Sequence, residues 1–250
     1  MSQPTHGLLH KLMAPMEQKL RRWMLYLRWG GRILVVIALI DLGYLMGVWP
    51  DWSLYDTGPI QRSNPIREYI AEQPSHPDWP PLQWHPVSLD HIAPEMARAV
   101  VVAEDSRFYQ HDGFDTEAFK KAMEYNMAHK RLVYGASTIS QQTVKNLFLN
   151  PSRNPLRKWH EVWITLGMER NLSKKRILEL YLNVAEFGRG IYGVEAAARH
   201  YWGVHAADLT PRQAAQLAAT LPAPVNHNPT TRTEYFVHRQ KKLMRYLGLS

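Results

Sequence analysis

Glu104 is the first residue of this 250-residue sequence whose type and setting suit catalysis. It follows a run of small and apolar residues, Ala99–Ala103, and Phe108 and His111 recur at i+4 and i+7 on the same helical face. A carboxylate at the edge of an apolar run loses water, which raises its pKa toward the value that a general acid or base needs. A solvated carboxylate at a helix end is the alternative, and the spacing alone favours it.

A polar stripe follows in the segment Gly135–Asn146. Ser137, Gln141 and Lys145 recur every four residues, and Thr138 with Gln141 has the form of a capping box. Backbone N–H groups at a helix start, with a lysine beside them, suit the binding of a phosphate. An exposed helix face with an ordinary N-cap is the alternative.

A cluster of cations comes next, at Arg153, Arg157 and Lys158. Together with Lys145 they suit an anion site, because Arg binds phosphate bidentately and Lys binds it as a point charge. Arg157 and Glu161 also have the spacing of a surface ion pair, which is worth only about 0.3–0.5 kcal/mol and needs no function. The twelve His residues show no metal-binding spacing such as H-E-x-x-H, and the absence of Cys excludes a thiolate nucleophile.

The elements that must position these residues are predicted to be helices. No alternating strand pattern of useful length occurs, so the fold class is mainly α. Start signals and helical periodicity predict helices from Pro94, over Thr116–His129, from Thr138, over Asn154–Arg170, from Ser173 to Asn183, and from Thr210 to Leu221.

One apolar run, Ile33–Trp49, precedes this helical region. As a helix it spans roughly 26 Å, close to the hydrocarbon core of about 30 Å. Asp41 at its centre costs about 2.5–3.5 kcal/mol, which the Leu, Ile and Val residues offset by roughly 3–6 kcal/mol. A cleaved signal peptide and a buried core helix are the alternatives, but no A-x-A-like cleavage site follows.

Charge is concentrated ahead of that run. Residues 1–32 hold six basic residues and one acidic residue, whereas residues 51–250 have a net charge of only +4. The positive flank predicts that residues 1–32 stay in the cytoplasm, and the mild charge of the remainder argues against a nucleic-acid binder. We therefore divide the chain into a basic segment (1–32), a transmembrane anchor (33–49), an extended Pro/Trp-rich tether (50–84) and an outer domain (85–250).

Taken together, these segments resemble the peptidoglycan glycosyltransferases, the family shared by class A penicillin-binding proteins and their monofunctional relatives. The resemblance covers roughly residues 85–225, and Ala136 and Trp202 depart from residues common in the family. The lack of S-x-x-K and K-T-G motifs points to the monofunctional form. The motifs that carry the resemblance are EDSRFYQHDGFD (Glu104–Asp115), GASTISQQTVKNLF (Gly135–Phe148), RKWHE (Arg157–Glu161), KKRILELYLN (Lys174–Asn183) and LTPRQAAQLAATLPAP (Leu209–Pro224).

The resemblance implies a lysozyme-like helical domain that polymerises lipid II with inversion at the sugar carbon and release of undecaprenyl pyrophosphate. It implies Glu104 as the general base and Glu161 as a second catalytic residue that assists near the donor or its metal-bound pyrophosphate. The residues implied to bind substrate and pyrophosphate are Ser137, Thr138, Gln141, Gln142, Lys145, Arg153, Arg157 and Lys158, and those implied to shape the site are Asp105, Phe108 and His111.

The same resemblance implies no obligatory cofactor, with Mg²⁺ or Mn²⁺ allowed at the donor pyrophosphate. The expected partners are lipid II, the growing lipid-linked glycan, the bilayer and cell-division or penicillin-binding proteins, without nucleic acid. The expected location is the inner membrane, with the N-terminus in the cytoplasm and the catalytic domain in the periplasm. A lysozyme-like lytic enzyme and a non-catalytic scaffold that binds lipid II are the alternatives, and the cations near Lys145 favour the polymerase because finished glycan has no pyrophosphate.

Overall fold

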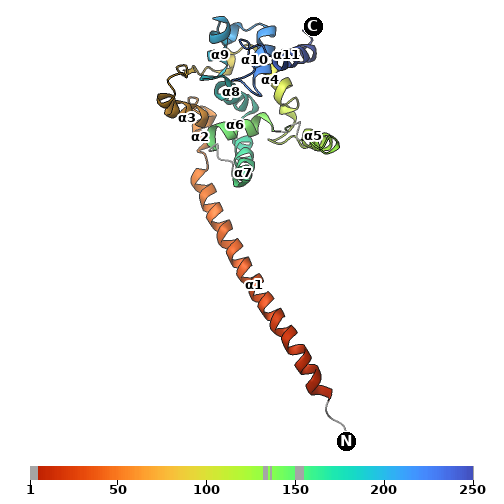
Figure 1. The fold of residues 1–250 in the computed structure, drawn as a ribbon. Coiled ribbons are helices and arrows are strands. Elements are labelled where there is room, and N and C mark those ends of the chain that lie inside the picture. The colour runs from red at the N-terminus through yellow and green to blue at the C-terminus, as the bar shows by residue number, and fades with distance from the viewer. Residues whose placement is uncertain (1–4, 132–134, 136, 150–154, 250) are drawn as a thin grey trace. The chain divides into compact units, whose positions relative to one another are not determined.

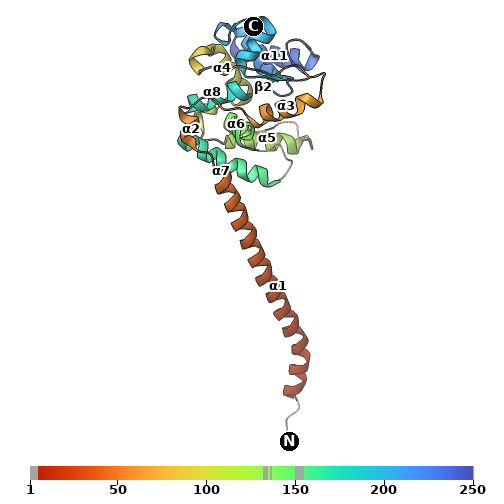
Figure 2. The same cartoon turned by 90° about the vertical axis from the view of Figure 1, so that its left-hand side faces the viewer.

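The computed structural model describes residues 5–131, 135, 137–149 and 155–249. The chain divides into two compact units, Met1–Trp49 and Pro50–Ser250, and each is described by itself. Figure 1 shows the element order, and Figure 2 shows the same ribbon from the side. The described elements are almost all helices, which confirms the mainly α prediction.

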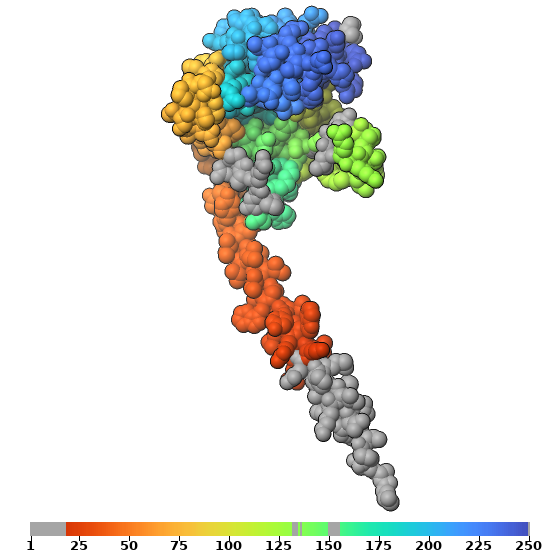
Figure 3. All heavy atoms as spheres, viewed as in Figure 1, coloured from red at the N-terminus to blue at the C-terminus, as the bar shows by residue number. Residues whose placement is uncertain are grey.

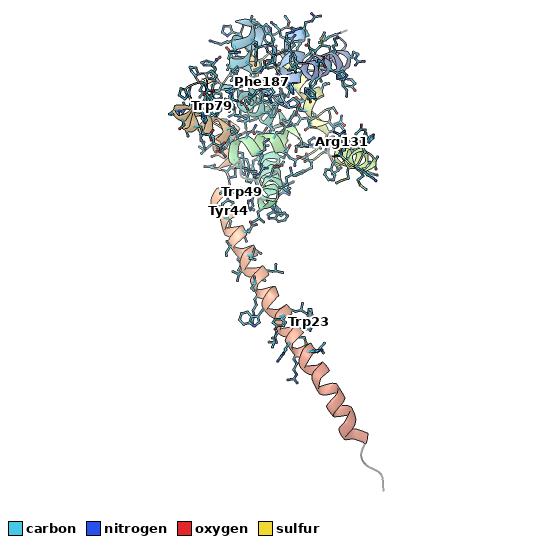
Figure 4. All side chains as sticks on the ribbon, viewed as in Figure 1. Trp23, Tyr44, Trp49, Trp79, Arg131 and Phe187 are labelled. Atoms are coloured by element: carbon cyan, nitrogen blue, oxygen red, sulfur yellow. The ribbon has the colours of Figure 1, made fainter. Side chains whose placement is uncertain are left out.

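The first unit is one long helix, α1 (Thr5–Val48). Its stretch Lys19–Val48 is long and apolar enough to cross a membrane. Apolar side chains stand exposed along this stretch, Leu34 and Ile40 at 68% each, and Figure 4 labels Trp23 among them. The helix begins earlier than the predicted anchor because the preceding basic residues are themselves good helix formers, and it ends just before Pro50.

The second unit holds the remaining helices. Three predicted N-caps are confirmed, since the side chains of Thr138, Ser173 and Thr210 accept hydrogen bonds from the backbone at the starts of their helices. The helices are α2 (Trp52–Asp56), α3 (Asn64–Glu72), α4 (Pro94–Glu104), α5 (Thr116–Ala128), α6 (Ile139–Phe148), α7 (Pro155–Asn171), α8 (Lys174–Val184), α9 (Val194–Trp202), α10 (Pro211–Thr220) and α11 (Glu234–Leu247). Short 3₁₀ turns cover Gln73–Ser75, Leu89–His91, Phe108–Gln110 and Ala206–Asp208.

A small three-stranded sheet adjoins the helices. Its strands are β1 (Gln83–Trp84), β2 (Glu186–Gly188) and β3 (Ile191–Tyr192), in the order β1-β3-β2. β3 runs parallel to β1 and antiparallel to β2, with Glu186 opposite Tyr192. The tight β2–β3 turn needs Gly190, whose φ is +73° and where a Cβ atom would lie 2.5 Å from the Tyr69 hydroxyl oxygen.

The core forms around α8 and α10. α10 packs against α4 and α11, while α8 packs against α6, α7 and α9. Leu178, Leu180 and Phe187 are completely buried, and Figure 4 labels Phe187 within the body of this unit. α5 has no buried side chain, and in Figure 3 its residues stand out from the rest of the unit. The packing therefore brings the C-terminal end of α4 close to both α10 and α11.

Residues 50–84 differ from the extended tether that their composition predicted. They contain α2, α3 and β1 and belong to the second compact unit. Hydrogen bonds hold them to the helical body, because Asn64 donates to the Leu149 carbonyl at 3.0 Å and Trp84 donates to the Asn183 carbonyl at 2.9 Å. The prolines and tryptophans favour this docking because they are stiff and apolar and supply packing surface.

Candidate active site

Glu104 ends α4 and is held from two other helices. Gln142 of α6 donates to its Oε2 at 3.0 Å, and Arg239 of α11 donates to its Oε1 at 2.8 Å. The Glu104 side chain is only 13% exposed. Burial raises the pKa of this carboxyl, and the bonds from Gln142 and Arg239 oppose that rise. The solvated alternative is therefore wrong, and Glu104 has the desolvated setting of a general base or acid.

A cleft of about 490 Å³ opens beside Glu104 between α4, α6 and α11, and we call it the base cleft. Its lining includes Glu104, Ser137, Gln142, Arg239, Lys242 and Tyr246. Arg239 is about one-quarter exposed, so its guanidinium lies partly open to this cleft. The base cleft offers one carboxylate and two cations to a ligand.

A second cleft of about 490 Å³ lies between α6, α7 and the β2–β3 strands, and we call it the cation cleft. Its lining includes Gln142, Lys145, Asn146, Arg157, Tyr181 and Glu186. Among the described residues, no hydrogen bond or ion pair reaches the Lys145 ammonium or the Arg157 guanidinium. The Arg157 Nε is buried and has no acceptor. Burial lowers the pKa of Lys145, an effect that Arg157 and Lys158 reinforce and Glu161 opposes. Two unpaired cations in one cleft suit an anionic ligand with several oxygens.

Gln142 joins the two clefts. Its Nε2 donates to Glu104, its Oε1 accepts from the Tyr181 hydroxyl at 3.2 Å, and it lines both cavities. Glu104 therefore lies on one side of Gln142, while Lys145 lies on the other. The proton acceptor in the base cleft and the anion site in the cation cleft thus share Gln142 as a lining residue.

Glu161 lies behind this surface. Its side chain is 4% exposed, and its carboxylate accepts from Gln141 at 3.2 Å and from Lys158. Gln141 also accepts from the Thr138 backbone, and the Thr138 hydroxyl donates to the Gly113 carbonyl at 2.7 Å. Hydrogen bonds therefore link Thr138 to Gln141, Gln141 to Glu161 and Glu161 to Lys158, so Thr138, Gln141 and Glu161 support the clefts from behind. Lys158 is half exposed and borders a separate apolar cavity with Phe119.

The start of α6 does not offer a free phosphate site. The Asp105 carboxylate accepts from the Ile139 backbone N–H at 3.0 Å, so a protein anion already occupies this helix start. The other Asp105 oxygen bonds His111 Nε2 at 2.9 Å, and Phe108 is fully buried beside that ring. Asp105, Phe108 and His111 therefore tie the loop after Glu104 to α6, as expected of site-shaping residues.

Asp105, His111 and Asp115 are near enough to hold a metal ion, with ligand atoms within 4.8 Å of one another. Their oxygens are already committed, since Asp105 bonds His111 and Ile139 while Asp115 caps α5 and pairs with Arg107. In the cation cleft region, the Glu161 carboxylate is likewise bonded by Lys158 and Gln141. The described residues therefore do not fit a resident metal ion well.

Sequence reasoning missed three contributors to the site. Arg239 contacts Glu104 from 135 positions along the chain, and the Tyr181 hydroxyl donates to Gln142 and orients it. Glu186, in a Gly-rich stretch, lines the cation cleft. The predicted residue Arg153 and the expected helix start at Asn154 lie outside the described residues.

Comparisons with known proteins show which family the sequence resembles. Residues 79–247 match the sequence model of a family described as transglycosylase. The chain is 36% identical to a biosynthetic peptidoglycan transglycosylase of Nitrosospira multiformis, over 88% of this chain and 96% of the relative. It is 47% identical to a protein of the same description from Bdellovibrio bacteriovorus, over 89% and 86%, and 50% identical to one from Shewanella oneidensis, over 66% and 71%.

Proposed function

The chain belongs to the transglycosylase family, a lysozyme-like helical family, and from this premise we propose how it acts as a peptidoglycan glycosyltransferase. It polymerises lipid II into the glycan strands of the cell wall. In the proposed reaction, the GlcNAc 4-hydroxyl of one lipid II attacks the MurNAc C1 of the lipid-linked chain with inversion. The C1–O bond to the pyrophosphate breaks, and undecaprenyl pyrophosphate leaves with the electron pair.

Glu104 is the general base of this step. Its carboxylate faces the base cleft, so an acceptor sugar in that cleft can present its 4-hydroxyl to it. The raised pKa strengthens Glu104 as a base, while Arg239 and Gln142 keep its ionised form populated and oriented. The acceptor hydroxyl proton therefore passes to Glu104 as the new glycosidic bond forms.

The donor pyrophosphate binds in the cation cleft. Among the described residues no ion pair reaches the Lys145 ammonium or the Arg157 guanidinium there, so both are free to bind a pyrophosphate. Fixed cations stabilise the negative charge that develops on the leaving group as the C1–O bond breaks. We assign Arg153 to the same donor site by family resemblance, and Ser137 to the acceptor through its place in the base cleft.

Glu161 is a positioning residue for Gln141 and Lys158. It holds Gln141 and Lys158, and Gln141 in turn completes the capping box of the helix that carries Lys145. Its negative charge also opposes the lowering of the Lys145 pKa and so favours the ammonium form. Mg²⁺ or Mn²⁺ that accompanies the pyrophosphate is not required, because the two cations already supply the positive charge.

We propose that α1 anchors the protein in the cytoplasmic membrane, with the N-terminus inside and the catalytic unit in the periplasm. The basic residues ahead of the apolar stretch support this orientation. Lipid II is itself confined to the bilayer, so a membrane anchor raises its effective concentration at the enzyme. Cell-division and penicillin-binding proteins are proposed as further partners, through the shared glycan product.

The observation that carries this proposal is the two cations Lys145 and Arg157, which have no ion-pair partner among the described residues and lie in a cleft that shares Gln142 with the cleft of Glu104. A lytic enzyme that cleaves finished glycan would also use a lone Glu, but it has no use for a pyrophosphate site. The test incubates the detergent-solubilised chain with labelled lipid II, and separately with purified sacculi. A lysozyme-sensitive ladder from lipid II supports the polymerase, whereas soluble fragments from sacculi without a ladder would establish the lytic alternative.

A further inference from the structure

Glu186 and Tyr192 are neighbours on one face of the small sheet. They are direct partners in the antiparallel β2–β3 ladder, so their side chains project from the same side. Both line the cation cleft, at its strand side, whereas Lys145 and Arg157 enter it from α6 and α7. The cleft therefore has a cationic helical side and an acidic strand side.

Neither side chain has a hydrogen-bond partner among the described residues. In the part of the chain that the structure describes, no hydrogen bond or ion pair reaches the Glu186 carboxyl or the Tyr192 hydroxyl. Arg189 is the nearest cation in sequence, but its guanidinium stacks over the Trp79 ring, 4.9 Å from the ring centroid. Trp79 is labelled in Figure 4. Polar groups at a cleft wall normally bond a protein group or water, so these two are free to bond a ligand that enters the cleft.

The electrostatic surroundings of Glu186 and Tyr192 agree with a role in binding a ligand. Burial raises the pKa of Glu186 to about 7, and the charge of Arg189 only partly opposes the rise. Burial also raises the pKa of the Tyr192 hydroxyl, which Glu186 raises further, so Tyr192 stays a neutral donor. The pair thus presents one acceptor and one donor to the cleft.

We propose that Glu186 and Tyr192 form a sugar-binding subsite that takes the hydroxyl and acetamido N–H groups of the lipid-linked donor, next to its pyrophosphate. This inference rests on the proposed function and extends it. The ligand groups bound here are neutral, because Lys145 and Arg157 in the same cleft repel an ammonium group and Glu186 repels a second anion. A donor that places its pyrophosphate on the helical side thereby presents its sugar to the strand side.

The test compares Glu186→Ala, Glu186→Gln and Tyr192→Phe in the full-length protein, with Glu72→Gln on the exposed surface of α3 as the matched control. Lipid II binding and steady-state polymerisation are both measured. Loss of a hydrogen bond to a charged acceptor predicts a roughly tenfold rise in KM and in the lipid II Kd for Glu186→Ala, with kcat within about twofold. Tyr192→Phe raises both about threefold, and the Glu72 variant changes neither.

Thermal unfolding separates binding from a structural role. Glu186→Gln removes a carboxyl that lacks a protein partner, so its Tm equals or exceeds that of the wild type. An unchanged KM and Kd in Glu186→Ala would overturn the subsite, as would a fall in Tm with Glu186→Gln. Failure of the wild-type protein itself to polymerise lipid II would instead overturn the proposed function, so the two failures are distinguishable.

Discussion

Arg239 of the C-terminal helix donates a hydrogen bond to the Glu104 carboxylate at 2.8 Å, although the two residues lie 135 positions apart. The same guanidinium approaches the Ala103 carbonyl at 3.4 Å, so it covers the end of α4. This contact couples α11 to the proposed base. It also means that the pKa of Glu104 reflects a balance between burial, which raises it, and Gln142 and Arg239, which lower it.

Polymerisation is expected to fall at low pH with the titration of Glu104. A general base works only when ionised, and burial raises the pKa of this carboxyl above its ordinary value of 4.5. The value of kcat/KM for lipid II, which reports the free enzyme, should therefore drop tenfold per pH unit on the acidic limb, with a midpoint above 4.5. A pH–rate profile measures this, and a limb centred at or below 4.5 would contradict the desolvated base.

Arg239→Ala should move that acidic limb to higher pH. The substitution removes both the charge and the hydrogen bond that favour the ionised carboxylate, so the pKa of Glu104 rises further. Arg239→Lys keeps the charge and should restore part of the shift. Arg245→Ala, on the exposed surface of the same helix, is the control that should leave the profile in place. A loss of rate without a shift would contradict the proposed effect of Arg239 on the pKa of Glu104.

Arg157→Ala should impair catalysis far more than Lys158→Ala, although the two cations are adjacent in sequence. Arg157 lines the cation cleft and has no ion-pair partner among the described residues, whereas Lys158 bonds Glu161 and borders another cavity. Loss of one donor to a developing charge typically costs about 10²–10³ in kcat. Steady-state kinetics with lipid II decide this, and equal losses for the two variants would contradict the placement of the pyrophosphate.

The stabilising effect of Glu186→Gln should grow with pH. The pKa of Glu186 is about 7 in the fold and 4.5 when unfolded, so the folded state holds the extra proton between these values. Wild-type stability therefore falls as pH rises from 4.5 to 7, by on the order of 3 kcal/mol. The Tm of the variant should match the wild type near pH 4 and exceed it at pH 8. A constant difference across this range would show that Glu186 is not desolvated.

Local signals in the sequence predicted much of the scaffold. At Thr138, Ser173 and Thr210 the capping side chain accepts from the backbone N–H three positions later. The signal for each cap is therefore local in the sequence. The grouping of Asp105 with His111 is also local, within one loop. Lys145 and Arg157 could be proposed as an anion site because their charges cluster in the sequence.

Features that depend on tertiary packing escaped the sequence. Residues 50–84 read as a tether because the partners that hold them, such as Leu149 and Asn183, lie about one hundred positions away. Arg239 lies in a helix without a catalytic motif, and only the packing of α11 on α4 brings it to Glu104. The Asp105 carboxylate bonds the backbone N–H at the start of α6, where a phosphate was expected. Rules for helix starts cannot anticipate this, because they do not show which other side chains reach the helix end.

Glu104 is proposed as the base that activates an acceptor in the base cleft for attack on a donor in the cation cleft. Glu104→Gln preserves the shape and the contact with Gln142 but removes the proton acceptor, so lipid II should bind with a Kd within about threefold of the wild type. Polymerisation of labelled lipid II should fall by at least about 10²–10⁴-fold. A Glu104→Gln variant that extends glycan at near the wild-type rate would contradict the account.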